Sequence, residues 1–82
     1  MLKQEVKYIK QIEFTHKGIK PRDINNAIKM LECYDYNVSR YKVLDKSIRF
    51  YFEDNTIDNV EEIHLHIEDN TDLKYKDRKC VN

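Results

Sequence analysis

The 82-residue chain has very few of the residues that build tight turns, disulfides and phosphate-binding loops. It contains one glycine, one proline, two cysteines and no tryptophan. A single glycine excludes a P-loop or a dinucleotide-binding fingerprint, because both need several glycines for the backbone to approach a phosphate. The same scarcity predicts short loops built mainly on Asn and Asp.

Cysteine clusters and long apolar runs are also missing. Cys33 and Cys80 lie far apart and outside any Cys-x-x-Cys pattern, which is typical of a reducing compartment. We expect Cys33 to be a small packing residue. No stretch approaches the roughly 20 apolar residues that cross a bilayer, and the charged N-terminus lacks the apolar segment of a signal peptide. The sequence therefore predicts a cytoplasmic protein that does not engage a membrane.

Enough apolar residues are nevertheless present to build one core. The chain is 40% hydrophobic and 11% aromatic, although 37% of it is charged. We expect a single globular domain over residues 1–69 and a polar, loosely ordered tail over 70–82. A domain of this size buries roughly 60% of the surface of its unfolded chain. Because such a core is small, a homodimer is one expected assembly.

The clearest predicted element is a helix over residues 21–34. Pro21 suits the first helical position, where a missing N–H costs nothing. Apolar residues then recur at intervals of three and four, which forms one stripe along a helix. That stripe consists of Ile24, Ala27, Ile28, Leu31 and Tyr34.

A hairpin is predicted to follow, with strands at 39–44 and 47–53 around a two-residue turn. The favoured register pairs Val43 with Ile48, Tyr41 with Phe50 and Ser39 with Phe52. Alternation of side chains then places Tyr41, Val43 and the apolar residues of the second strand in the core. The outer face carries Arg40, Lys42, Arg49 and Tyr51.

Two further segments complete the expected fold. Residues 60–68 alternate apolar and polar side chains, which predicts a strand. Residues 2–15 fit either a helix or a strand, and their β-favouring run over 12–15 favours the strand. The predicted fold class is α+β. We expect a small two-layer β-α-β-β-β domain, with one helix packed on one face of a three- or four-stranded, mainly antiparallel sheet. The alternative order is α-α-β-β-β.

Charge is segregated along a chain whose formal net charge is zero. Residues 1–52 carry eleven Lys or Arg against six Asp or Glu, a net of +5. Residues 53–72 carry eight acidic residues and no Lys or Arg, and residues 73–82 carry a net of +3. This pattern predicts separate acidic and basic surfaces.

No pattern in the sequence indicates catalysis. Ser39 and Ser47 lie outside any nucleophile elbow, and no pair of carboxylates stands out as an acid and a base. We therefore expect no enzymatic activity and no cofactor. His64 and His66 form a weak candidate metal pair, because a strand would place both rings on one face. A solvated strand face is the preferred interpretation of that pair.

The leading functional hypothesis is a non-enzymatic protein–protein interaction module, an inhibitor or regulator. Complementary charge would speed its encounter with a basic partner, and exposed tyrosines would anchor it. A small domain without a site, rich in Lys, Asn, Ile and Tyr, is similar in style to accessory proteins of phages and mobile elements. The expected contact residues are Glu53, Asp54, Asp58, Glu61, Glu62, Glu68 and Asp69, with Tyr36 and Tyr51 as aromatic anchors.

The alternative hypothesis is a nucleic-acid-binding module. Cations on the outer face of the hairpin would meet phosphates, and a tyrosine would stack on a base. Zero net charge and the neighbouring acidic segment argue against this hypothesis. The residues it requires are Arg40, Lys42, Lys46, Arg49 and Tyr51.

Overall fold

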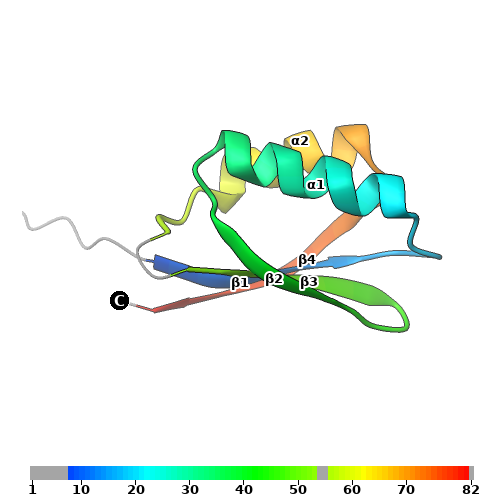
Figure 1. Ribbon diagram of the computed structural model, residues 1–82, viewed down its shortest axis with the longest axis horizontal. Helices are drawn as coiled ribbons and strands as arrows, with labels where there is room; N and C mark the ends of the chain where they lie inside the picture. Colours follow the sequence, from blue (N-terminus) through cyan, green and yellow to red (C-terminus); the bar gives the residue numbers. More distant parts are fainter. Residues whose placement is uncertain (1–7, 54–55, 82) are drawn as a thin grey trace, which may run out of the picture.

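Four strands and two helices form along residues 8–53 and 56–81, the part of the chain that the computed structural model describes. The elements are β1 (Tyr8–Thr15), α1 (Pro21–Cys33), β2 (Val38–Val43), β3 (Ser47–Phe52), α2 (Val60–Asn70) and β4 (Lys74–Val81). The four strands form one antiparallel sheet in the order β2-β3-β1-β4, and both helices pack on the same face of it (Figure 1). The predicted class, a small two-layer α+β domain, is confirmed.

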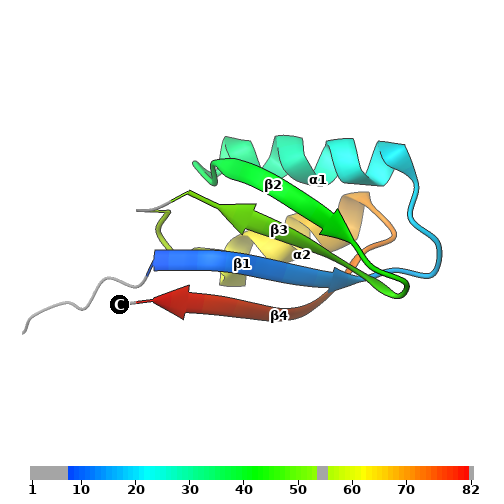
Figure 2. The ribbon, with the colours of Figure 1, turned by 60° about the horizontal axis from the view of Figure 1, so that its bottom comes forward.

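Each helix connects two parallel strands that are separated by a third. Helix α1 leads from β1 to β2 with β3 between them, and α2 leads from β3 to β4 with β1 between them. This is the split β-α-β arrangement, also called ferredoxin-like. Such crossovers are almost always right-handed, which brings both helices to one face of the sheet. Figure 2 shows the other face, which no described element covers and which we call the open face.

The first two-thirds of the described chain agrees closely with the sequence patterns. Helix α1 begins at Pro21 as predicted, and its apolar stripe is turned into the core. Residues 8–15 are a strand, so the alternative order α-α-β-β-β is wrong. The hairpin pairs Tyr41 with Phe50 as predicted. A register shift between Val38 and Arg40 makes Val38, rather than Ser39, the partner of Phe52.

The segment predicted as a third strand, 60–68, is instead the helix α2. Val60, Ile63 and Ile67 have helical spacing and are buried, whereas Leu65 is 55% exposed. Short apolar runs fit both periods, so their alternation alone does not distinguish strand from helix. The start of α2 carries signals of a helix: the Asp58 carboxylate, just before it, accepts a hydrogen bond from the Val60 N–H, and Glu61 and Glu62 lie in the first turn.

The structure also differs from the loosely ordered tail expected over 70–82. Residues 74–81 form β4, which pairs along the length of β1. Leu73 is fully buried, and Tyr75 packs edge-on against Phe14. Two register shifts interrupt the pairing of β4 with β1. Because these shifts break the two-residue period, the charged sequence shows no alternation that predicts a strand.

The core lies between the sheet and the helices. Phe14 and Phe50 are fully buried and meet edge to face, with ring centroids 6.2 Å apart. Tyr41 and Val43 were expected in this core but are 46% and 42% exposed. They lie on β2, which is at the edge of the sheet, where neighbours cover only one side of a strand.

Cys33, expected to pack in the core, is exposed at the end of α1, and neither cysteine forms a disulfide. The apolar stripe of α1 turns the opposite face of the helix to solvent, and Cys33 lies on that face. Neither helix within residues 8–53 and 56–81 is long and apolar enough to span a membrane.

Candidate functional site

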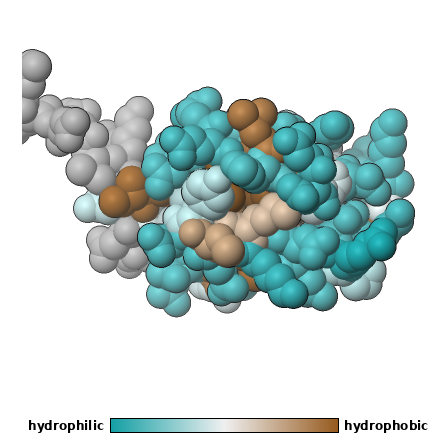
Figure 3. Space-filling view, turned by 90° about the horizontal axis from the view of Figure 1, so that it is seen from above, coloured by the Kyte–Doolittle hydropathy of each residue, from teal (hydrophilic) through white to brown (hydrophobic). Residues whose placement is uncertain are grey.

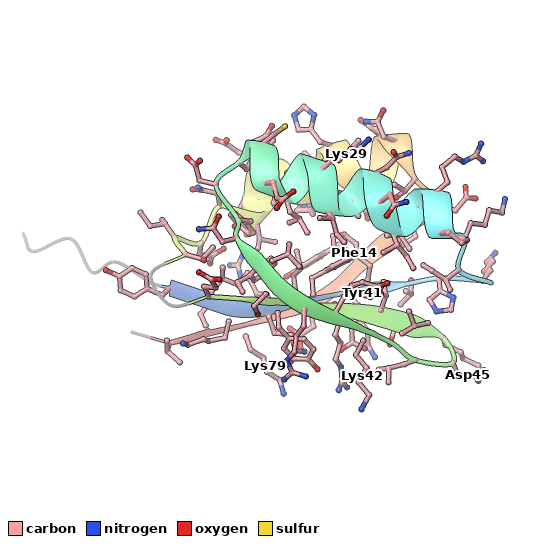
Figure 4. The ribbon with its side chains drawn as sticks, in the orientation of Figure 1. Phe14, Lys29, Tyr41, Lys42, Asp45 and Lys79 are labelled. Carbon is pink, nitrogen blue, oxygen red and sulfur yellow. The ribbon has the colours of Figure 1, made fainter. Side chains whose placement is uncertain are left out.

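The open face of the sheet gathers basic side chains from three strands. Lys42 on β2 and Lys79 on β4 both point away from the helices (Figure 4). Strand pairing places the outward positions of β3, β1 and β4 beside them. We call this surface the basic face; its cations are Arg40, Lys42, Arg49, Lys74, Lys76 and Lys79, and its acidic residues are Glu13 and Asp77.

One buried carboxylate organises the centre of the basic face. Glu13 on β1 is 6% exposed, and its two oxygens lie 3.2 Å from Arg49 Nε and 3.4 Å from Lys76 Nζ. A hydrogen bond from Ser47, then those from Arg49 and Lys76, outweigh burial and lower the pKa of Glu13. Glu13 is therefore ionised, and it forms ion pairs that position the side chains of Arg49 and Lys76 on the open face.

Tyr51 lies on this face, and Arg40 covers one side of its ring. The guanidinium carbon of Arg40 lies 4.1 Å from the centroid of the Tyr51 ring. This distance is typical of a cation–π contact. The hairpin therefore presents a guanidinium group packed on an aromatic ring, where the sequence predicted an exposed tyrosine. Arginine planes, like aromatic rings, stack on nucleic-acid bases.

The acidic residues lie on the other side of the sheet, mostly on or beside α2. Arg78 bridges two of them, with its Nε 3.4 Å from Asp58 and its Nη1 3.2 Å from Glu61. A Glu68 oxygen accepts a hydrogen bond of 2.9 Å from the backbone N–H of Tyr75. Asp58, Glu61 and Glu68 therefore interact with groups of the domain itself. Among the acidic residues predicted to meet a partner, Glu53, Glu62 and Asp69 are exposed without such a contact, and Asp54 lies outside the described residues.

Tyr36, the other predicted aromatic anchor, is a core residue. It is 1% exposed, and its ring meets that of Phe52 edge-on at 5.0 Å. Its hydroxyl accepts a hydrogen bond from the backbone N–H of Asn59. Burial raises the pKa of Tyr36 to about 12. The chain reverses after α1 through Asp35, which has a positive φ of 64°, and this turn directs Tyr36 inward.

The two histidines point in different directions because residues two apart diverge on a helix. His64 stacks on Tyr75 with centroids 4.9 Å apart and lies 3.4 Å from Glu68. His66 packs instead against Tyr34, the residue directly after α1, with ring centroids 5.5 Å apart. Residues 60–68 form part of the helix α2 and not the predicted strand, so the two rings do not share one face. Among the residues that the structure describes, no group of three or more His, Cys, Asp or Glu side chains is arranged to hold a metal ion.

Comparisons of the chain with protein-family models, with curated proteins and with solved structures find no match. The split β-α-β arrangement supports many unrelated activities, so it does not by itself identify one.

Proposed function

We propose that this domain is a non-enzymatic module that binds single-stranded nucleic acid on the basic face. The observation that carries the proposal is the separation of charge across the sheet. Cations gather on the open face, while α2 carries the acidic residues on the opposite layer. The proposal includes a reducing, cytoplasmic location, which suits the exposed thiol of Cys33.

This separation answers both arguments that the sequence raised against nucleic acid. Zero net charge is the sum of two unlike sides rather than a neutral surface. The solvent side of α2 is separated from the basic face by the sheet and by a helix about 10 Å in diameter. That exceeds the Debye length of about 8 Å at physiological ionic strength, so the acidic side repels a strand on the basic face only weakly.

The shape of the surface favours a single strand over a duplex. A major groove about 12 Å wide admits one helix or a two-stranded ribbon. Four strands spaced about 4.8 Å apart span about 14 Å between the axes of the outer two, which is too wide for that groove. An unpaired strand can lie along the sheet, with its phosphates near the cations and its bases turned toward the protein.

Specific residues have separate tasks in this proposal. Lys42 on β2 and Lys76 and Lys79 on β4, the two outer strands of the sheet, neutralise phosphates along the path. Arg40 offers its guanidinium plane, supported by the Tyr51 ring, for stacking with one base. Because stacking accepts every base, we expect little sequence preference.

Fluorescence anisotropy with a labelled single-stranded oligonucleotide at low salt tests the proposal, because electrostatic affinity is greatest there. We expect binding that weakens as salt rises. Replacing Lys42 and Lys79 with Gln should lower the magnitude of the salt slope by about 1.4, since each lost phosphate contact removes about 0.7.

The matched control is Lys29→Gln, which removes one exposed cation from α1 on the opposite layer (Figure 4). This variant should bind as the unaltered protein does. Absence of binding at low salt, or equal losses in the Lys29 variant and the basic-face variant, would contradict the proposal.

The acidic side supports a second candidate function, a contact with a basic protein. Leu65 is 55% exposed on α2 between Glu62 and Asp69, which combines an apolar contact with two carboxylates. Figure 3 shows that the surface over the helices is mostly hydrophilic, with separate apolar spots. If a basic protein binds this side, reversing the charge of Glu62 and Asp69 should abolish that binding and leave oligonucleotide binding intact.

Homodimerisation stays a prediction, which sedimentation would test.

A further inference from the structure

A cleft at one end of the sheet adjoins the basic face. Three connections meet there: the β1–α1 loop, the β2–β3 turn and the α2–β4 loop (Figure 2). The cleft has a volume of about 980 Å³. Its charged lining residues are the cations Lys17, Lys20, Lys46 and Lys74 and the carboxylates Asp45 and Asp72.

Internal hydrogen bonds hold the walls of this cleft in place. His16 Nε2 lies 3.0 Å from the Leu44 carbonyl oxygen and 3.1 Å from that of Ser47, so it donates to the β2–β3 hairpin. Its Nδ1 accepts the backbone N–H of Gly18 at 3.1 Å. These contacts require the neutral ring with hydrogen on Nε2. The backbone N–H of His16 also donates to the Lys46 carbonyl at 3.0 Å.

Hydrogen bonds therefore join the β1–α1 loop to the β2–β3 turn, and Lys17 and Lys46 from these two connections both line the cleft. Gly18 adopts a positive φ of 130°, which an L side chain rarely tolerates, so the tight turn of the β1–α1 loop depends on this glycine. His16 and Gly18 act here as positioning residues, and neither needs to touch a ligand.

The lining charges do not cancel. Lys20 lies 3.7 Å from Asp72, so this pair is largely neutral as a unit. Lys17, Lys46 and Lys74 then face the single remaining carboxylate, Asp45. The cleft thus carries an excess of positive charge, and its cations are flexible ammonium groups suited to phosphates.

The cleft is continuous with the basic face. Lys74 belongs to both, because it is the first residue of β4 and pairs with Thr15 on the open side of the sheet. Lys46 occupies the turn that joins the two strands bearing Lys42 and Arg49. A single-stranded nucleic acid that extends past this end of the sheet would therefore remain in contact with lysine side chains.

We propose that this cleft binds phosphates of the same single strand beyond the sheet, so that the nucleic-acid site extends around the loop end of the domain. This inference rests on the proposed function of the basic face. It assigns the cleft to the backbone of the polymer, with the sheet alone contacting bases. The stacking pair, Arg40 over Tyr51, lies on the basic face.

Oligothymidylates of about 5 and about 15 nucleotides, near the lower and upper ends of known single-strand site sizes, separate the two parts of the path. The unaltered protein should bind the longer one more tightly and with a steeper salt dependence. The Lys17→Gln/Lys46→Gln variant should lose that advantage, and its salt slope for the longer strand should fall by about 1.4. Binding of the shorter strand should not change.

Two comparison variants separate failure of this inference from failure of the proposed function. Arg40→Gln/Lys42→Gln should weaken both lengths, and Lys29→Gln should weaken neither. If the cleft variant keeps the unaltered slope while the Arg40/Lys42 variant weakens both lengths, the cleft is not part of the site, and the basic face remains. If neither oligonucleotide binds the unaltered protein at low salt, both proposals fail.

Discussion

The two faces of the sheet come from the same strands but obey different physical rules. On the covered face, Phe14, Ile48 and Phe50 are fully buried and belong to one hydrophobic core with apolar residues of both helices. On the open face, the neighbouring positions carry charged side chains around the single buried carboxylate of Glu13. Stability should therefore depend on the covered face, and affinity for an anionic polymer on the open one.

Phe14→Ala should have the largest effect on this comparison. Removing a fully buried phenyl ring that meets Phe50 and Tyr75 should destabilise the fold by about 3 to 5 kcal/mol. Lys42→Gln on the open face should change stability by no more than about 0.5 kcal/mol. Urea denaturation measures both. Similar losses in the two variants would show that the faces do not divide stability in this way.

Tyr36 should make the covered side sensitive to alkaline pH. The pKa of this phenol rises from its ordinary 10.0 to about 12 on folding. Its contribution is therefore complete below pH 10.0 and is lost as pH rises toward 12, because the unfolded chain ionises first. Two pKa units correspond to about 2.7 kcal/mol.

The measurement is the free energy of unfolding across this pH window for the unaltered protein and for Tyr36→Phe. The variant should lose less stability over the window, because it has no hydroxyl to ionise at that position. Tyr75, whose pKa burial also raises, contributes in the same direction in both proteins. Parallel pH curves would contradict the assignment.

Glu13→Gln should lower stability less than the changes at Phe14 and Tyr36 on the covered side, and it should strengthen binding. The amide keeps an acceptor but loses the charge that holds Arg49 and Lys76, which should cost roughly 1 kcal/mol. Because Glu13 has a lowered pKa, the unaltered protein should lose the same contribution as pH falls through the folded value.

The same variant should bind a single-stranded oligonucleotide more tightly and with a steeper salt slope, because one negative charge leaves the basic face. Anisotropy at matched salt measures this gain. Weaker binding in a variant that remains folded would show that Glu13 organises the surface more than its charge opposes the ligand.

Local sequence patterns predicted those elements whose signals lie within their own residues. The Pro21 start and the helical stripe of α1 predict it without reference to the rest of the chain. The hairpin pairs neighbours in sequence, so its register also follows from local alternation. Four of the basic residues proposed to bind nucleic acid, Arg40, Lys42, Lys46 and Arg49, come from this segment.

The structures of α2, β4 and the segment around Tyr36 could not be predicted, because they depend on contacts with residues distant in the sequence. Residues 60–70 fit both periods, and packing of Ile63 and Ile67 against the core selects the helix. Strand β4 pairs with β1, which lies at the other end of the described chain, so its contribution of Lys76 and Lys79 to the basic face has no local signal. Tyr36 has the composition of a surface anchor, yet the turn after α1 buries it.

By itself, the sequence determined the class of the fold, the helix α1, the hairpin and the division of charge into blocks along the chain. The tertiary structure alone decided on which side of the sheet each block lies. The reason is that charge blocks are a property of the chain, whereas a surface is assembled from segments that only pairing and burial bring together. Arg78, from the basic C-terminal block, binds the acidic side, while Lys76 and Lys79 from the same strand join Lys42 on the open face.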